Sequence, residues 1–371
     1  MLRRRVALSV PRPPPPATVT SSSPDQTRRG AAAACLPAVL AAALLVAACG
    51  SSHPSASRTA APSAGTSSAT ATTGAAAPAT TPAPAADPRL RVLHTGHLPA
   101  PVQLPAVAPA GSGLLAIGGL DAADASVASI VRVQGTSARV IGRLPSPLHD
   151  AAAATIGSQT WFFGGGQAGA GSTQVLRILP SGGTRPAGTL PAGASDVAAA
   201  TIGGTAYVVG GYTGTVALRS IFAFTPGHGI RVVAEMPRPL RYAAVAAVGG
   251  RLLIAGGTSG TTARSEILSF DPASGRVRRV GRLPSAVTHA VGAALGGRFY
   301  VLGGRGASLT AQRAAILAVD PATGRVRSAG RLPVALSDLS AASLPGQVTV
   351  VGGRDASGRV HDEIWALGAG A

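Results

Sequence analysis

Two residue patterns that each recur six times predict an all-β fold for most of this chain, a six-bladed β-propeller of four-stranded antiparallel blades. A Gly pair recurs at steps of 47, 45, 46, 47 and 49 residues, and a Leu-Pro or Met-Pro pair recurs at steps of 46, 46, 46, 47 and 49. Because two separate markers keep nearly one period, each period is one structural unit. The Gly pairs are Gly118-Gly119, Gly165-Gly166, Gly210-Gly211, Gly256-Gly257, Gly303-Gly304 and Gly352-Gly353, and the Pro pairs are Leu98-Pro99, Leu144-Pro145, Leu190-Pro191, Met236-Pro237, Leu283-Pro284 and Leu332-Pro333.

One repeat illustrates the four strands expected in each unit. Ala243–Val248 is a short strand of small residues, and Gly249-Gly250 forms the hairpin turn to an apolar strand, Arg251–Ala255. Ser265–Phe270 is expected as the third strand, and Arg276–Val280 as a fourth, more polar one. Four antiparallel strands make one propeller blade, with the first strand nearest the central axis and the fourth on the outer rim.

The two ends of the repeat region are expected to complete one blade together. The last repeat stops after its third strand, His361–Leu367, whereas an additional strand of the fourth type, Arg89–His94, precedes the first repeat. Pairing of these segments would close the ring and remove exposed strand edges, which otherwise promote aggregation. The N-terminal strand is therefore expected to complete the last blade.

The repeat resembles the kelch repeat, and the resemblance extends over residues 88–371. It rests on the apolar strand that ends in a Gly pair, a strand that ends in Asp-Pro (Asp271-Pro272 and Asp320-Pro321), and a strand that leads to Leu-Pro. The chain lacks the Tyr and Trp residues that usually pack between kelch blades. Aromatic residues make up only 3% of the sequence, so we expect a core built from closely spaced small residues.

The high positive charge does not by itself predict a nucleic-acid partner. The formal net charge is +18, and all 32 basic residues are Arg; 25 of them, from Arg89 onward, accompany 12 acidic residues. They are spread singly along the repeats, which favours a solvated basic surface over a nucleic-acid site. The absence of Lys and Asn indicates a GC-rich genome of the actinobacterial type. We therefore expect no nucleic-acid partner.

Residues 1–48 are expected to be a signal peptide. Arg28 and Arg29 precede an apolar run, and Val46-Ala47-Ala48-Cys49 resembles a bacterial lipobox. This resemblance implies lipidation of Cys49 and an extracytoplasmic position, anchored to the cell membrane by lipid. A plain signal peptide or a single transmembrane helix is the alternative. The Pro-rich and Ser-rich residues before Arg28 are unusual in a signal peptide, and an over-extended gene start is one explanation for them.

The remaining chain is expected to divide into a tether and the propeller. Residues 49–87 consist almost wholly of Ser, Ala, Thr, Pro and Gly, a composition that predicts a disordered tether. Residues 88–371 form the propeller, which is expected to be monomeric and to meet the membrane only through the lipid anchor. Both cysteines, Cys35 and Cys49, precede the propeller, so it has no disulfide and no thiol chemistry.

Polar residues recur at two positions of the repeat that are expected to surround one mouth of the central channel. The residue five after each repeat Pro is Leu104, Asp150, Asp196, Tyr242, His289 or Asp338, and the residue after each Gly pair is Leu120, Gln167, Tyr212, Thr258, Arg305 or Arg354. Carboxylates, Arg and Tyr suit a glycan or peptide ligand. The alternative is that they are solvated residues that cap strand ends, as Asp often does at turns. The predicted ligand-binding residues are Asp150, Asp196, Tyr242, His289, Asp338, Gln167, Tyr212, Arg305 and Arg354.

Known enzyme patterns fit the sequence less well than a binding module does. The histidines are scattered, without the spacing of metal ligands, and no nucleophile elbow occurs. Kelch-type copper oxidases need a Cys-linked Tyr, and the predicted propeller has no Cys. Kelch-type mutarotases use Arg and carboxylate groups at the channel mouth, parts that would fall to Asp150, Asp338 or Arg354.

We therefore expect a binding module for a glycan or protein ligand, with no cofactor, no metal and no assigned catalytic residue. A carbohydrate-active enzyme of the kelch mutarotase or oxidase kind is the alternative. A bound metal, or a mouth carboxylate with a strongly raised pKa, would favour the enzyme.

Overall fold

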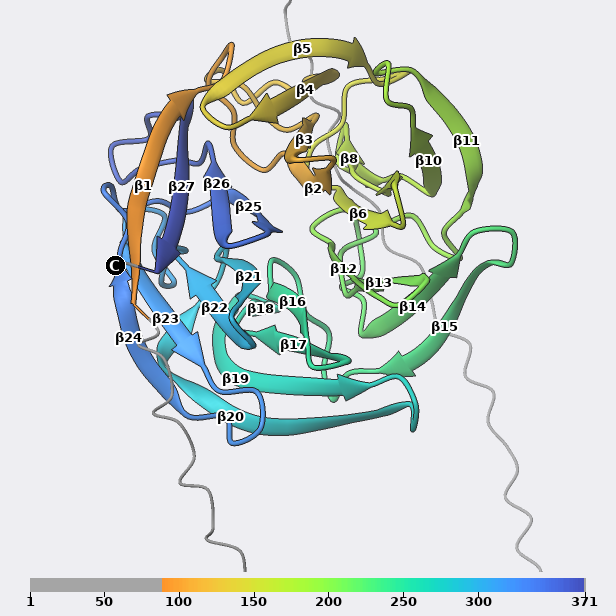
Figure 1. The fold of residues 1–371 in the computed structure, drawn as a ribbon. Coiled ribbons are helices and arrows are strands. Elements are labelled where there is room, and N and C mark those ends of the chain that lie inside the picture. The colour runs from red at the N-terminus through yellow and green to blue at the C-terminus, as the bar shows by residue number, and fades with distance from the viewer. Residues whose placement is uncertain (1–88, 370–371) are drawn as a thin grey trace, which may run out of the picture. The chain divides into compact units, whose positions relative to one another are not determined.

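A computed structural model describes residues 89–369 and shows a ring of six four-stranded antiparallel sheets (Figure 1). This confirms the predicted six-bladed propeller. No helix that could span a membrane occurs among residues 89–369. The expected signal peptide, Cys49 and the tether lie outside the described residues.

The strands of blades one to three are β2 (Ala106–Ala110), β3 (Gly113–Ile117), β4 (Ser129–Gln134) and β5 (Ser137–Arg143); β6 (Ala152–Ile156), β7 (Gln159–Phe163), β10 (Gln174–Ile178) and β11 (Thr184–Thr189); and β12 (Ala198–Ile202), β13 (Thr205–Val209), β14 (Ser220–Thr225) and β15 (Gly229–Glu235).

The remaining three blades follow the same plan, and three short strands, β8 (Gly166–Gln167), β9 (Ala170–Gly171) and β18 (Thr258–Ser259), lie in loops that follow the Gly pairs. In the repeat analysed above, the two inner strands match the expected ranges closely, whereas the two outer strands are longer because their pairing continues beyond two register shifts. These strands are β16 (Ala244–Val248), β17 (Arg251–Ala255), β19 (Thr262–Asp271) and β20 (Arg276–Val287); β21 (Val291–Leu295), β22 (Arg298–Leu302), β23 (Ala315–Val319) and β24 (Val326–Arg331); and β25 (Ser340–Leu344), β26 (Gln347–Val351), β27 (Glu363–Ala369) and β1 (Leu90–His97).

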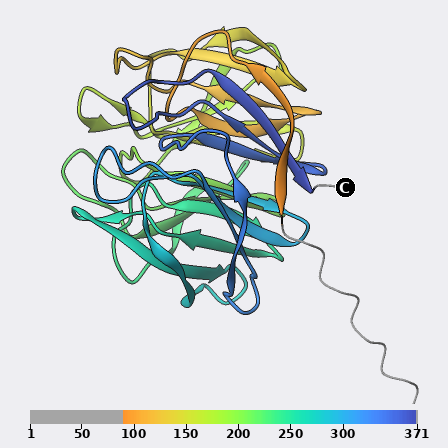
Figure 2. The same ribbon diagram turned by 90° about the vertical axis from the view of Figure 1, so that its left-hand side faces the viewer.

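The ring is closed by pairing between the two ends of the described chain. β1 runs antiparallel to β27, from Leu90 opposite Ala369 to His97 opposite Glu363. Figure 1 and the turned view in Figure 2 both show the two strands side by side. The predicted closure is thus confirmed. Every strand of the ring lies within residues 90–369, so this segment contains all the strand contacts that the propeller needs to fold.

Six clusters of buried apolar side chains fill the interfaces between neighbouring blades. Alanines of the inner strands contribute to them, as expected, but the expectation of a core without large rings is only partly right. All six Phe residues of the chain are buried. The Trp161 and Phe224 rings lie 4.9 Å apart, and the Tyr207 and Phe270 rings lie 5.5 Å apart. The few aromatic residues are therefore placed between blades, where each buries a large apolar area.

The Gly pairs allow neighbouring blades to approach closely. Gly352 has φ +59°, and a Cβ there would lie 2.1 Å from the Val102 carbonyl oxygen, while Gly353 N donates to that oxygen at 2.9 Å. In the second blade, Gly165 N donates to the Ala194 carbonyl oxygen of the next blade, as Gly353 N does to that of Val102. The equivalent pair of this blade is therefore Gly164-Gly165, one residue earlier than predicted. With this correction, the Gly pairs and the Pro pairs share the steps 46, 46, 46, 47 and 49.

Candidate functional site

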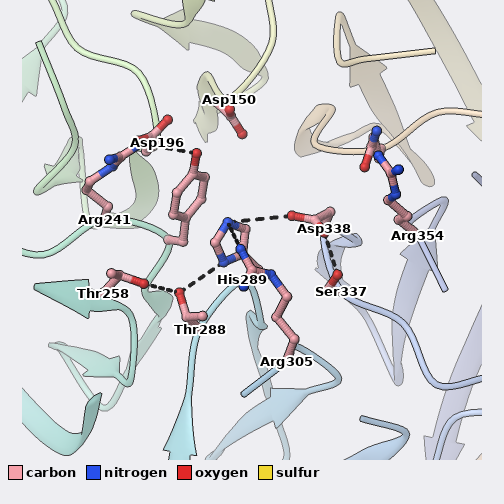
Figure 3. A network of polar contacts seen from close by, with 12 residues as sticks. Asp150, Asp196, Arg241, Thr258, Thr288, His289, Arg305, Ser337, Asp338 and Arg354 are labelled. Atoms are coloured by element: carbon pink, nitrogen blue, oxygen red, sulfur yellow. Dashed lines mark hydrogen bonds and ion pairs between the residues drawn. The ribbon is translucent and has the colours of Figure 1, made fainter. Parts of the chain in front are cut away.

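The structure brings the residues five after each repeat Pro together around the central channel. We call Leu104, Asp150, Asp196, Tyr242, His289 and Asp338 the inner ring. All six line one cavity of about 130 Å³, together with residues of the inner strands. Figure 3 shows Asp150, Asp196, His289 and Asp338 converging on the same space. The predicted positions therefore lie together around one cavity, with four different side-chain chemistries at its edge.

The backbone of the inner ring is held in an unusual conformation. All six residues are left-handed, with φ between 52° and 61°. Their amides and carbonyls link blade to blade in a closed belt of hydrogen bonds, with N–O distances from 2.7 to 3.4 Å; at one step Val197 N donates in place of Asp196 N. Asp and His adopt left-handed φ values more readily than most residues. The left-handed backbone is therefore a second reason for Asp at these positions, besides ligand binding. It agrees in part with the alternative interpretation, in which these residues cap strand ends.

The three carboxylates of the inner ring are buried and differ in their partners. Asp150 is 8% exposed, Asp196 5% and Asp338 8%. Asp196 accepts a hydrogen bond from Arg241 Nε, and Asp338 accepts one from the Ser337 hydroxyl. Asp150 Oδ1 has no hydrogen-bond partner among the described residues. Asp150 is thus the inner-ring carboxylate with a buried oxygen that lacks a hydrogen-bond partner among the described residues.

Burial also changes the protonation of these groups. It raises the pKa of Asp150 well above the usual range, and the nearby Asp196 and Asp338 carboxylates raise it further, although Arg241 opposes the shift. Burial raises the pKa of Asp338 as well, against the effect of its hydrogen bond from Ser337. The channel therefore favours protonated carboxyl groups at these two positions.

A stacked pair, Tyr242 and His289, forms a flat surface in the inner ring. Their ring centroids are 3.7 Å apart and the planes are inclined by 22°. Arg305 Nη2 lies 3.3 Å from His289 Nε2, and because a guanidinium only donates, Nε2 must be the unprotonated acceptor. His289 Nδ1 then donates to Thr288 Oγ1 at 3.0 Å. The imidazole is neutral, and burial followed by the charges of Arg305 and Arg241 lowers its pKa to about 2.

Arg241, which was not predicted, is the centre of the polar contacts on one side of the mouth. Besides Asp196, it contacts the Tyr242 hydroxyl at 3.4 Å, and its guanidinium carbon lies 4.0 Å from the centre of the Tyr212 ring. A cation in this position fixes the orientation of both tyrosines. Its place in the repeat could have indicated it, because Arg241 is the fourth residue after its repeat Pro. The residue at this position of each repeat forms a β-bridge with the residue that follows a Gly pair. This second ring is Gln103, His149, Ser195, Arg241, Thr288 and Ser337.

Two further hollows open beyond the inner ring, of about 380 and 540 Å³. Both are lined by His289, Arg305 and Leu309, and Leu309 is 74% exposed. Arg354 lines the larger one and donates to Asp124 at 2.8 Å. Arg305 and Arg354 therefore lie at the mouth as predicted.

Gln167 lies elsewhere than predicted. It is an exposed residue of β8 that pairs with Ala170, one residue beyond the equivalent position, Gly166. The cause is the shifted Gly pair of the second blade. Within residues 89–369, no group of three or more His, Cys, Asp or Glu side chains could hold a metal ion.

Comparison with known proteins agrees with this architecture. The family profile of the Kelch motif matches residues 193–230 and 239–284, which cover the three inner strands of the third blade and nearly all of the fourth blade. The protein is therefore a six-bladed β-propeller in which two neighbouring blades match the Kelch motif.

Among solved structures, one titled "Structure of YjhT" matches with a TM-score of 0.64 and 15% sequence identity, covering 72% of this chain and 95% of that chain. At this identity the likeness concerns the fold alone. No curated protein sequence matches the chain significantly. Since 919 chains of solved structures match this fold, the function must be argued from the site.

The protonation of Asp150 leads to a testable pH dependence. As pH rises above the ordinary carboxyl pKa of about 3.9, the unfolded chain loses the Asp150 proton while the folded chain keeps it, because its folded pKa is raised. The free energy of unfolding then falls with rising pH until the folded pKa is passed. Asp150→Asn removes this loss and keeps a residue that tolerates left-handed φ. We expect this variant to be more stable than wild type at pH 7 by about 1–3 kcal/mol, with the difference disappearing near pH 3.

The measurement is urea unfolding of both proteins across this pH range. Asp355→Asn is the matched control, and its effect on stability should have the opposite sign. Burial acts to raise the pKa of Asp355, but hydrogen bonds, those with Ser357 and His361 foremost, lower it to about 2. That variant should be less stable than wild type at pH 7, because the wild-type carboxylate loses its stabilising effect only as pH falls toward 2. An Asp150→Asn protein that is destabilised at pH 7 would contradict the assignment.

Proposed function

We propose that this protein is a lipid-anchored, cell-surface propeller that binds a glycan or protein ligand at the channel mouth. The observation that carries the proposal is the neutral Tyr242–His289 stack, which lies beside Arg241 and Arg305 above buried carboxylates. A flat ring surface suits the face of a sugar or an aromatic side chain, and the flanking donors suit hydroxyls and carbonyls. Kelch propellers generally act as interaction modules, which supports the same interpretation.

The mouth has the mixed lining that polar ligands require. The apolar surface comes from Leu309 and the stacked rings, whereas Arg305, Gln312 and Ser337 supply polar groups in the larger hollow. Arg305 donates a hydrogen bond to His289 and lines both hollows. A ligand that fills both would therefore meet Arg305 and Leu309 at its centre.

A glycan and peptide array tests this function directly. Residues 50–371 should bind a restricted set of ligands, and the affinity should fall at least about tenfold in Arg305→Gln and in Tyr242→Asn, since tenfold corresponds to about 1.4 kcal/mol. Asn is used at position 242 because it tolerates the left-handed backbone. Arg231→Gln, on the exposed face of β15, is the control with the same change of charge. Binding that both mouth variants retain would refute the site.

The raised pKa of Asp150 supports a second candidate, a carbohydrate-active enzyme of the mutarotase kind. A buried carboxyl whose pKa lies well above the usual range is suited to general acid–base transfer at a sugar hemiacetal. The test follows the anomers of a panel of reducing sugars by proton NMR after dissolution. Wild type should accelerate their equilibration and Asp150→Asn should not. A wild-type rate equal to that in buffer would exclude this candidate.

The lipid anchor is an independent part of the proposal. Cys49 is the residue that the lipobox resemblance assigns to lipidation, so Cys49→Ser should move the protein from the membrane fraction to the soluble fraction. Fractionation of cells that express each form, with detection of the propeller by antibody, measures the shift. Persistence of the Cys49→Ser variant at an unchanged level in a high-salt-washed membrane fraction would contradict the anchor.

A further inference from the structure

The outer strands of the last three blades form a strongly basic surface on the circumference of the propeller. β20 carries four exposed arginines, β24 two and β1 one, and these three strands contain no Asp or Glu. β5, β11 and β15, the outer strands of the first three blades, carry four arginines together with Glu235. We call the first group the basic rim: Arg276, Arg278, Arg279, Arg282, Arg327, Arg331 and Arg91.

The fold brings these arginines together although they are far apart in the sequence. β20 contacts β24, and β24 contacts β1. Figure 1 shows the three strands following one another along the rim, from β1 at the upper left through β24 to β20 at the bottom. A dispersed set of single arginines in the sequence thus becomes one continuous patch. This gathering follows from the closure of the ring, which places β1 next to the fifth blade.

Strand register shows which arginines of the basic rim have an acidic residue opposite them. Arg276 lies opposite Asp271, and Arg282 lies opposite Glu266. The other five have uncharged residues opposite them in register: Arg278 faces Ser269, Arg279 Leu268, Arg327 Ala318, Arg331 Ala315 and Arg91 Gly368. Most of the positive charge of this surface is therefore available to an external anion.

The described chain begins within this same surface. Leu90, the first residue of β1, lies against β24, where a Cβ on Gly330 would be 2.6 Å from the Leu90 carbonyl oxygen. Residues 50–89 connect this point to Cys49. The chain therefore enters the propeller on the side where the basic rim lies, and a lipid on Cys49 would keep that side within reach of the membrane.

We propose that the basic rim rests on an anionic lipid surface. This inference rests on the lipid anchor of the proposed function only for keeping the propeller near the membrane, and it adds a second membrane contact beyond that anchor. An arginine near an anionic bilayer contributes roughly 1 kcal/mol, and one lipid group combined with a basic patch holds a protein more firmly than either does alone. With the circumference on the membrane, the channel axis lies along the membrane plane and the mouth faces sideways, open to ligands.

The test uses residues 50–371, which lack Cys49 and the apolar run, so any membrane binding comes from the protein surface. Co-sedimentation is measured with vesicles of phosphatidylglycerol and phosphatidylcholine in equal parts, and with phosphatidylcholine alone. Wild type should bind the anionic vesicles only, and the triple variant Arg278→Gln, Arg279→Gln, Arg327→Gln should lose roughly a hundredfold in affinity. The matched control is Arg139→Gln, Arg143→Gln, Arg185→Gln on β5 and β11, which removes the same charge from the opposite arc.

Four results would overturn the proposal. Equal loss in both triple variants would show that overall charge, and not the basic rim, drives binding. Equal binding to phosphatidylcholine vesicles would exclude an electrostatic mechanism, as would binding that persists in 1 M salt, where the screening length falls to about 3 Å. Tighter, rim-dependent binding to duplex DNA or soluble polyphosphate than to vesicles would assign the surface to a polymer. None of these outcomes depends on Cys49 or on the channel mouth, so the ligand-binding function is tested separately.

Discussion

Deletion of β1, residues 89–97, is expected to prevent the ring from closing and to cause the largest loss of stability of any change considered. β1 provides seven register positions opposite β27 and buries Leu90 between the last two blades. At about 1 kcal/mol for each net hydrogen bond, the loss is on the order of 5 kcal/mol, comparable with the entire stability of many domains. The deletion also leaves the edge of β27 open to pairing with other molecules.

Urea unfolding and size-exclusion chromatography of residues 50–371, with and without residues 89–97, measure both effects. The deletion protein should unfold at a much lower urea concentration and form oligomers. A deletion of similar position but without strand residues, 60–68, is the control and should match the parent protein. If the chain without β1 remains a monomer with an unchanged midpoint, the closing strand is not required and the closure argument fails.

Replacement of Arg241 by Met is expected to have the second-largest effect, because it leaves the buried Asp196 carboxylate without its cation. Asp196 has a 3% exposed side chain and accepts from Arg241 Nε, whose side chain is 26% exposed. Removing one partner of a buried ion pair costs about 3–5 kcal/mol. The same change releases the Tyr212 and Tyr242 rings from the guanidinium, so ligand binding should fall with stability.

A double-mutant cycle separates these consequences. Asp196→Asn keeps a residue suited to left-handed φ and removes the charge, so the pair Arg241→Met with Asp196→Asn should recover most of the stability lost in Arg241→Met. Ligand binding should not recover, since the cation beside the tyrosines is still missing. Thermal unfolding and the array affinity give the two readouts. Additive stability effects would show that Arg241 and Asp196 are not coupled.

Much of the fold could be predicted because it is repeated. A marker that occurs six times averages out local ambiguity, so the number of blades followed from its spacing. The role of β1 followed from the additional strand before the first repeat and the missing fourth strand of the last one. The outer strands were predicted too short because their pairing continues past bulges, as at Arg264–Glu266, which leave no local mark in the sequence. The aromatic core was underestimated because composition gives the number of rings and not their location.

The candidate site was predicted by position but not by interaction. Counting from the repeat Pro placed Asp150, Asp196 and Asp338 correctly around one cavity. It could not indicate that Arg241, one residue earlier in its repeat, reaches back to Asp196 of the preceding blade. The Gly triplet at 164–166 allowed two alignments, and the later one gave Gln167 as the residue after the Gly pair. The inter-blade hydrogen bonds select the earlier alignment, and its agreement with the steps of the Pro pairs was the signal in the sequence.

The closed backbone belt has a consequence for how such a protein can change its specificity. The belt depends on main-chain amides and carbonyls, so the side chain at each of its six positions can be exchanged without unlinking its neighbours. The main restriction is the left-handed backbone, which favours Asp, Asn, His and Gly. A library that varies these six positions among Asp, Asn, His and Gly would sample many combinations of channel-lining side chains on one backbone.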